Sequence, residues 1–194
     1  RTILYVVMTV IKDDQPFELY DVYGGLGQFE DTFDKPEVLF LKLKEQYEHL
    51  INKSEGVYPE AGMHDCIMDA DLAGILAHEA IGHTTEGDIV KGGSVAGDFL
   101  GEKVASEMVT LVDFAHTAFG EQCPVPVYVD DEGTKAEDAV IIKDGILKKF
   151  MHNKETALHF GHEVTGNARA YGFYDEPLVR MRNKAILQGK SRIE

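Results

Sequence analysis

The stretch Val140-Ile-Ile-Lys-Asp-Gly-Ile-Leu-Lys-Lys-Phe150 indicates the class of fold. Its Asp144-Gly145 pair lies between two apolar runs, and Asp-Gly in this setting is the strongest short-range sign of a β-hairpin. Elsewhere along the chain, strand-forming runs also come in pairs instead of alternating singly with helices. The sequence therefore predicts an α+β fold with mainly antiparallel strands and two or three helices.

Two strands and a long helix are expected in the first third of the chain. Residues 2–11 are β-branched and aromatic, which predicts a strand buried on both faces, and a second strand follows over residues 17–23 after a turn. Pro36 opens an amphipathic helix that ends near residues 54–56. A two-stranded antiparallel start followed by a helix is the expected arrangement.

The other predicted elements follow from shorter signals. Asp69 or Asp71 caps a buried helix that runs from about Leu72 into the region of His78. The remaining predictions are strands at residues 66–68, 108–112 and 125–129, and helices at residues 102–107 and 153–160. Because no low-complexity linker or internal repeat interrupts the sequence, we expect a single α+β domain over residues 1–194.

The amino-acid composition argues against some classes of binding partner. The chain has 194 residues, with 34 acidic against 19 basic residues and a net charge of −15. This balance argues against sequence-independent binding to nucleic acid and against docking on an anionic membrane. No apolar run reaches the ~18–20 residues of a membrane span, no secretory signal is visible, and two cysteines do not make a disulfide framework. We therefore expect a reduced, cytoplasmic protein.

The stretch Leu76-Ala-His-Glu-Ala-Ile-Gly-His-Thr-Thr-Glu-Gly-Asp88 concentrates the residues with catalytic chemistry. It brings His78, Glu79 and His83 close together in sequence and adds two further carboxylates. Imidazole and carboxylate are the ligands of a catalytic zinc ion that keeps one position open for water. A glutamate beside such a ligand can accept the proton of that water.

The spacing of the two histidines constrains the helix that carries them. His78 and His83 are five residues apart, which places them about 140° apart around a regular α-helix. They can bind one ion together only if the helix deforms, and a π-turn at Gly82 would align them. Two alternatives remain: the helix ends before His83, or the two histidines are unrelated residues of a partly buried helix.

The motif from His78 to His83, followed by Glu86-Gly87-Asp88, resembles the HExxxH signature of the TldD/PmbA metalloprotease family. Further segments are similar to the family's motifs and occur in the family's order. They are residues 24–30, 101–107, 130–134, 165–169 and 177–183. The resemblance thus covers nearly the whole chain, which corresponds to the central part of a TldD-like protein.

The resemblance implies a zinc-dependent metallopeptidase that hydrolyses peptide bonds of extended or unfolded peptides. Carried over, His78 and His83 are zinc ligands and Glu79 is the general base. The family pairs a TldD-like subunit that has HExxxH with a PmbA/TldE-like partner that lacks it, and this chain has the motif. The expected partners are therefore a peptide substrate and such a subunit or a second copy, without nucleic acid or membrane.

The third zinc ligand departs from the family's pattern. In the TldD type it is a cysteine beyond the segment that ends at Asn183, and neither Cys66 nor Cys123 matches its place. Glu86 and Asp88 are then the first candidates within the chain. A different class of function remains open, namely a non-catalytic partner or scaffold module with a degenerate metal site. Family members have also been called modulators of DNA gyrase, but the net charge opposes direct contact with DNA.

Two further groups of charged residues have a structural and a functional interpretation. Residues 130–132 are three carboxylates that could bind a divalent ion, although an acidic turn open to solvent is favoured. Arg169, Arg180 and Arg182 could hold a peptide carboxylate, although structural ion pairing is favoured.

Overall fold

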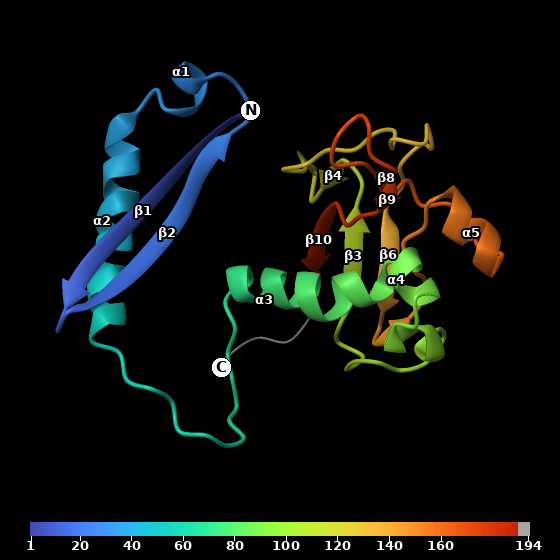
Figure 1. Cartoon of the computed structure of the whole chain (residues 1–194), viewed down its shortest axis with the longest axis horizontal. Coiled ribbons are helices and arrows are strands. Elements are labelled where there is room, and N and C mark those ends of the chain that lie inside the picture. The colour runs from blue at the N-terminus through green and yellow to red at the C-terminus, as the bar shows by residue number, and fades with distance from the viewer. Residues whose placement is uncertain (190–194) are drawn as a thin grey trace. The chain divides into compact units, whose positions relative to one another are not determined.

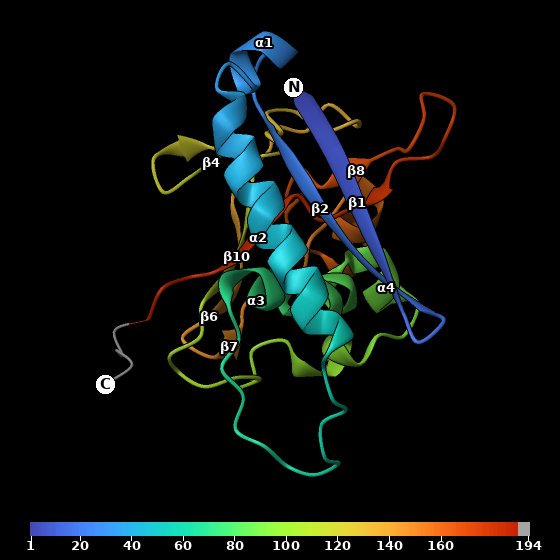
Figure 2. The same ribbon diagram turned by 90° about the vertical axis from the view of Figure 1, so that its left-hand side faces the viewer.

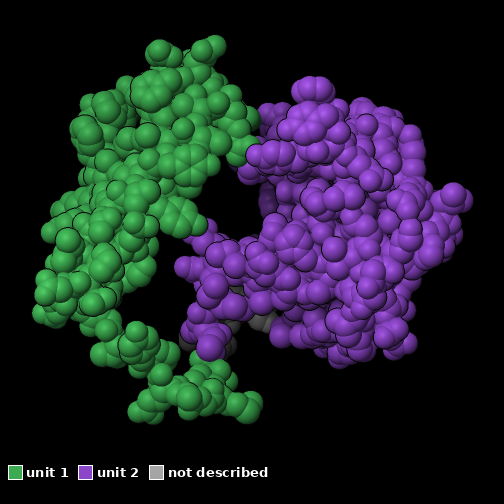
Figure 3. Space-filling model, viewed as in Figure 1, with its two compact units in different colours: residues 1–65 green, residues 66–194 purple. Residues whose placement is uncertain are grey.

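A computed structural model describes residues 1–189, and it divides the chain into two compact units (Figure 3). Unit 1 is residues 1–65, and unit 2 begins at Cys66. The single α+β domain expected over residues 1–194 stays a prediction. Both units combine helices with antiparallel strands, so the predicted α+β fold class is confirmed.

Unit 1 is a long β-hairpin with a helix along it (Figures 1 and 2). Strands β1 (Thr2–Lys12) and β2 (Gln15–Gly25) pair antiparallel along their whole length, and the short helix α1 (Phe29–Thr32) leads to α2 (Pro36–Ser54). Pro36 occupies the first helical position, as predicted, because its missing N–H would have no partner there.

The expectation that the first strand is buried on both faces is wrong. Exposure alternates along β1: one face is half-buried, and the other exposes Tyr5, Val7 and Ile11. Gln46 of α2 ties the half-buried face to the helix, because its amide donates to the carbonyl oxygen of Val6 at 3.1 Å. Within unit 1 the one long helix covers a single face of the two-stranded sheet. Half-buried and exposed residues therefore alternate along β1.

Unit 2 is built on a four-stranded antiparallel sheet with the strand order β10-β3-β6-β7. Figure 1 labels β10, β3 and β6 of this sheet. Its strands are β3 (Leu111–Phe114), β6 (Ala139–Lys143), β7 (Ile146–Leu147) and β10 (Asn183–Ile186). The predicted hairpin is β6–β7, and its turn places Asp144 and Gly145 at φ 50° and 78°. The sheet contributes Leu111, Ile141 and Ile142 to the buried core.

Smaller elements surround this sheet. They are the strand pairs β4 (Thr117–Ala118) with β5 (Glu121–Gln122) and β8 (Ala168–Arg169) with β9 (Leu178–Val179), the helices α3 (Ala70–Leu76), α4 (Gly87–Lys91) and α5 (Lys154–Phe160), and the short turns η1 (Ala77–Gly82), η2 (His83–Thr85) and η3 (Val95–Phe99). The α-helices longer than five residues in the described part are α2, α3 and α5. None of the helices within residues 1–189 is both long and apolar enough to cross a membrane.

Several short elements predicted in unit 2 do not form. Residues 66–68 and 125–129 are not strands, residues 102–107 are not helical, and the strand expected at 108–112 begins at Leu111. Long-range hydrogen bonds explain the missing helix. The amides of Val104 and Ala105 both donate to the carbonyl oxygen of Gly145, at 2.9 and 3.1 Å, so this segment is held against the β6–β7 turn as irregular chain.

Candidate metal centre

The motif lies on a continuous helical segment that changes its type twice. It begins as α3, where the side chain of Asp69 accepts a hydrogen bond from the amide of Leu72, so Asp69 is the cap. The segment then becomes a π-helix over η1 (Ala77–Gly82) and a 3₁₀ turn over η2 (His83–Thr85). The predicted departure from regular α geometry near Gly82 is confirmed.

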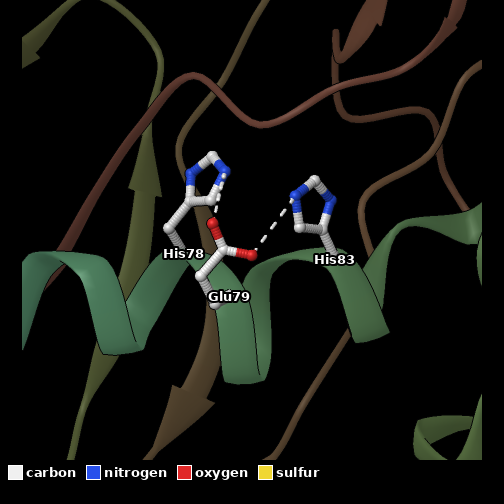
Figure 4. A group of neighbouring side chains, drawn as sticks. All are labelled: His78, Glu79 and His83. Atoms are coloured by element: carbon white, nitrogen blue, oxygen red, sulfur yellow. Dashed lines mark ion pairs between the residues drawn. The ribbon is translucent and has the colours of Figure 1, made fainter.

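The π-turn brings the two histidines together. The amide of His83 donates to the carbonyl oxygen of His78, so the five-residue separation equals one π-turn. The imidazole centroids lie 4.8 Å apart with the rings nearly perpendicular, at 86°. Figure 4 shows both rings on the same side of the helix as Glu79. The alternative in which the helix ends before His83 is therefore wrong.

The three side chains form a compact donor set. Their ligand atoms all lie within 4.8 Å of one another, and each Glu79 oxygen is 4.0 Å from the Nε2 atom of one histidine. Among residues 1–189 this is the only group of three or more His, Cys, Asp or Glu side chains that could hold a metal ion. The cluster supplies two imidazoles and one carboxylate. Neither Cys66 nor Cys123 belongs to it.

The cluster faces solvent. The His78, Glu79 and His83 side chains are 49%, 66% and 48% exposed. The expectation of a buried helix is therefore wrong for most of its length, because only the narrow face with Ala77 and Gly82 packs inward. In this chain the three side chains are therefore accessible from solvent.

Close packing on the inner face explains the glycine at position 82. Gly82 has φ −58° and ψ −64°, which any residue can adopt, so its conformation does not require glycine. A Cβ atom there would overlap Met181 Sδ and would lie 3.1 Å from Lys184 Nζ. Because these two residues lie just before and within β10, the missing side chain lets the π-turn approach the sheet.

The three residues after the 3₁₀ turn, Glu86 to Asp88, each make a different contact. The Glu86 side chain is 1% exposed, and its Oε2 atom lies 3.2 Å from Nδ1 of His83. A Cβ on Gly87 would come within 2.8 Å of Met151 O, so only glycine fits. The Asp88 carboxylate accepts a hydrogen bond from the amide of Val179 at 3.2 Å. Neither Glu86 nor Asp88 belongs to the metal-ligand cluster, so the structure does not bring either candidate third ligand to it.

The predicted acidic turn at residues 130–132 serves the backbone. Asp130 is 6% exposed, and its carboxylate accepts hydrogen bonds from the amides of Glu132, Thr134 and Ala168. These bonds join the turn to β8. Asp130 is therefore buried, whereas Asp131 is exposed and Glu132 half-buried, so the turn is open to solvent at Asp131, as favoured from the sequence. None of the three carboxylates belongs to the metal-binding group.

The three arginines also have structural partners. Arg182 Nε donates to Asp113 Oδ2 at 2.8 Å, and both side chains are fully buried. Arg169 and Arg180 donate to the backbone carbonyl oxygens of Met181 and Val179. Structural ion pairing is thus confirmed for Arg182.

Sequence reasoning missed two buried basic side chains. His152 is 1% exposed, and desolvation, assisted by the neighbouring His162 and Lys149, lowers its pKa to about 4. Lys184 has a buried Nζ atom, and desolvation lowers the pKa of this ammonium to about 8 although the charges of Asp113 and Glu86 oppose the shift. No local pattern marks either residue, because their burial depends on segments that are distant in sequence.

The chain is similar to known metalloproteases. The family model described as the PmbA/TldA metallopeptidase C-terminal domain matches residues 61–194. A metalloprotease of Methanocaldococcus jannaschii is 41% identical over 169 residues, which are 86% of this chain and 35% of that protein. A zinc metalloprotease TldD homolog of Saccharolobus solfataricus is 33% identical over 191 residues, 98% of this chain and 42% of that protein.

The fold also matches a solved structure. TldE from Thermococcus kodakarensis superposes with a TM-score of 0.64 at 21% identity, and the match covers 97% of this chain and 41% of that one. This chain therefore spans well under half the length of the relatives it matches. On the family match over residues 61–194 and the similarity to these relatives, the chain belongs to the PmbA/TldD metallopeptidase family.

Proposed function

We propose that this chain carries the metal centre of a zinc-dependent metallopeptidase, which hydrolyses peptide bonds of extended or unfolded peptides in the cytoplasm. One observation carries the proposal: the π-turn places His78, Glu79 and His83 on one exposed side of a helix. The metalloprotease names of the relatives support the same activity.

The donor set fits zinc. Zinc binds imidazole nitrogens at roughly 2.0–2.1 Å in a tetrahedron, so two such nitrogens on one ion lie roughly 3.4 Å apart. The ligand atoms of the cluster lie within 4.8 Å of one another, and rotation of half-exposed side chains is enough to close the remaining gap. In this proposal His78 and His83 are the ligands, and a third protein ligand completes the site, as catalytic zinc centres require.

Glu79 has the position of a general base. Zinc at this site would polarise a water molecule and lower its pKa to roughly 7. The Glu79 oxygens lie 4.0 Å from each imidazole, so its carboxylate can accept the proton of the attacking water beside the ligands without being one of them. The same carboxyl group then donates this proton to the leaving amine of the peptide.

The exposure of the site supports an extended substrate. The three side chains are about half to two-thirds exposed, so a peptide backbone reaches them across an open surface. An extended segment can lie on such a surface, whereas a folded chain hides most of its peptide bonds in secondary structure. The fold match to TldE supports a TldE-like subunit or a second copy of this chain as the partner.

The second candidate function is a non-catalytic partner or scaffold module with a degenerate metal site. The observation that favours it is the ligand count, because within the described residues the cluster offers only two imidazoles besides Glu79. Zinc content separates the two functions: the peptidase binds one zinc per chain in the complete protein, whereas the degenerate module binds it weakly.

The roles of Glu79 and His83 are tested by two substitutions in the complete, zinc-loaded protein. Glu79→Gln should reduce peptide hydrolysis by about 10²–10⁴-fold and leave zinc bound, because the amide has the same shape but cannot accept the proton. His83→Ala should lose both zinc and hydrolysis, because it removes a ligand. Near-normal turnover in Glu79→Gln would exclude Glu79 as the base, and loss of zinc in that variant would make it a ligand or a support.

A further inference from the structure

We propose that Glu86 is a positioning residue for His83. Its carboxylate holds the proton of the imidazole on Nδ1 and thereby leaves Nε2 free to bind the metal ion. This inference rests on the proposed function, because it assigns a role toward the same metal centre. It adds a residue that lies outside the His78, Glu79 and His83 cluster.

The contact itself carries the proposal. Glu86 Oε2 lies 3.2 Å from Nδ1 of His83, while Nε2 of the same ring lies on the side of Glu79, 4.0 Å from its Oε2 atom. A carboxylate accepts hydrogen bonds and cannot donate them when ionised, so the ring nitrogen beside it carries the proton. The other nitrogen then has a free lone pair, as a metal ligand requires.

The surrounding chain fixes Glu86 in this position. The amide of Gly87 donates to the carbonyl oxygen of Met151 at 2.9 Å, and the amide of Met151 donates to the carbonyl oxygen of Thr85 at 3.0 Å. These two bonds hold the backbone on both sides of Glu86. Because its side chain is 1% exposed, the carboxylate cannot swing into solvent and stays against His83.

The buried carboxylate is not explained as structural support alone. Its second oxygen, Oε1, is buried and has no hydrogen-bond partner among the described residues. The Nζ atom of Lys184 is likewise buried without one, and its positive charge interacts with Glu86. A position that served only packing would favour an apolar side chain, because burying an incompletely paired charge is unfavourable. The contact with His83 gives this carboxylate a function.

Two measurements on the full chain test the proposal. The first is zinc affinity, from competition with a chromophoric chelator. The second is the tautomer of His83 in metal-free protein, from the ¹⁵N chemical shifts of its imidazole, assigned by comparison with His83→Ala. The second measurement needs no metal and no activity, so it remains decisive even if the proposed peptidase function fails.

Three variants distinguish positioning from stability. Glu86→Ala should weaken zinc binding by about 10–100-fold and shift the His83 proton from Nδ1 toward Nε2. Glu86→Gln keeps an oxygen acceptor, so it should retain the Nδ1–H tautomer with an intermediate affinity. Asp88→Asn is the matched control, because Asp88 contacts the amide of Val179 and should leave both measurements unchanged.

The proposal is overturned if Glu86→Ala binds zinc within twofold of the unaltered chain and keeps the Nδ1–H tautomer. If Glu86→Ala does not fold, Glu86→Gln decides: a tenfold loss of affinity supports the proposal, and an unchanged affinity overturns it. If the unaltered chain binds no zinc, the proposed function is contradicted. If Glu86→Ala nevertheless loses the Nδ1–H tautomer of His83, the orienting role of Glu86 is still supported.

Discussion

Substituting Gly82 by alanine tests whether close packing holds the π-turn against the sheet. In an open helix, glycine to alanine stabilises a protein by about 1 kcal/mol through helix propensity. At Gly82 the new methyl group would overlap Met181 Sδ and approach Lys184 Nζ to 3.1 Å and Ala77 O to 3.2 Å. Overpacking of a filled interior costs about 1–3 kcal/mol. The cost offsets or exceeds the gain, so we expect Gly82→Ala to lower the free energy of unfolding by up to about 2 kcal/mol.

Gly74→Ala is the matched control for this experiment. Gly74 lies in α3, and a Cβ atom there would meet nothing within 4 Å. This variant should gain about 0.5–1 kcal/mol, because only the propensity term applies. Denaturant unfolding of both variants measures the difference. If Gly82→Ala were as stable as Gly74→Ala, the π-turn would not be packed against Met181, and our explanation of the glycine would be refuted.

Two further predictions concern buried titratable groups in unit 2. Arg182→Met should lower the free energy of unfolding by about 3–5 kcal/mol in denaturant titration, because it leaves Asp113 buried without its partner; a loss below about 1 kcal/mol would contradict this. The His152 pKa of about 4 lies below the value of about 6.5 in the unfolded chain. Between these pH values the unfolded state therefore binds more protons than the folded state. The free energy of unfolding should fall as pH drops from about 6.5 to about 4. His152→Gln should flatten this slope, and an identical pH profile would exclude His152 as its source.

The elements that the sequence predicted well have local signals. The Asp144-Gly145 turn, Pro36 at a helix start, and the helix expected at residues 153–160, observed as α5, each depend on neighbours in sequence. The failures include short segments with weak local signals, such as residues 125–129. There the amide of Val127 donates to the carbonyl oxygen of Ala115, a partner that no local pattern identifies. Tertiary hydrogen bonds therefore decide where local preference is weak.

At the metal centre, too, local features could be predicted from the sequence and distant contacts could not. The five-residue spacing of His78 and His83 is a property of the sequence. Helix geometry was enough to predict from it a departure from regular α geometry near Gly82, and the structure shows that this departure is a π-turn. The support behind it was not predictable, because Met181 and Lys184 come from the far end of the chain. From the sequence, Glu86 was a candidate third ligand. Its burial and its contact with Nδ1 of His83 are visible only in the structure, and they support the positioning role proposed above.

The central claim is that one π-turn lets His78 and His83 bind a single zinc ion. The most direct measurement is an anomalous difference map at the zinc edge from crystals of the complete protein grown with zinc. Our account predicts one peak within about 2.0–2.1 Å of a nitrogen of each imidazole, with Glu79 beside it and outside bonding distance. A peak bound by only one of the two histidines, or no peak at this cluster, would contradict it.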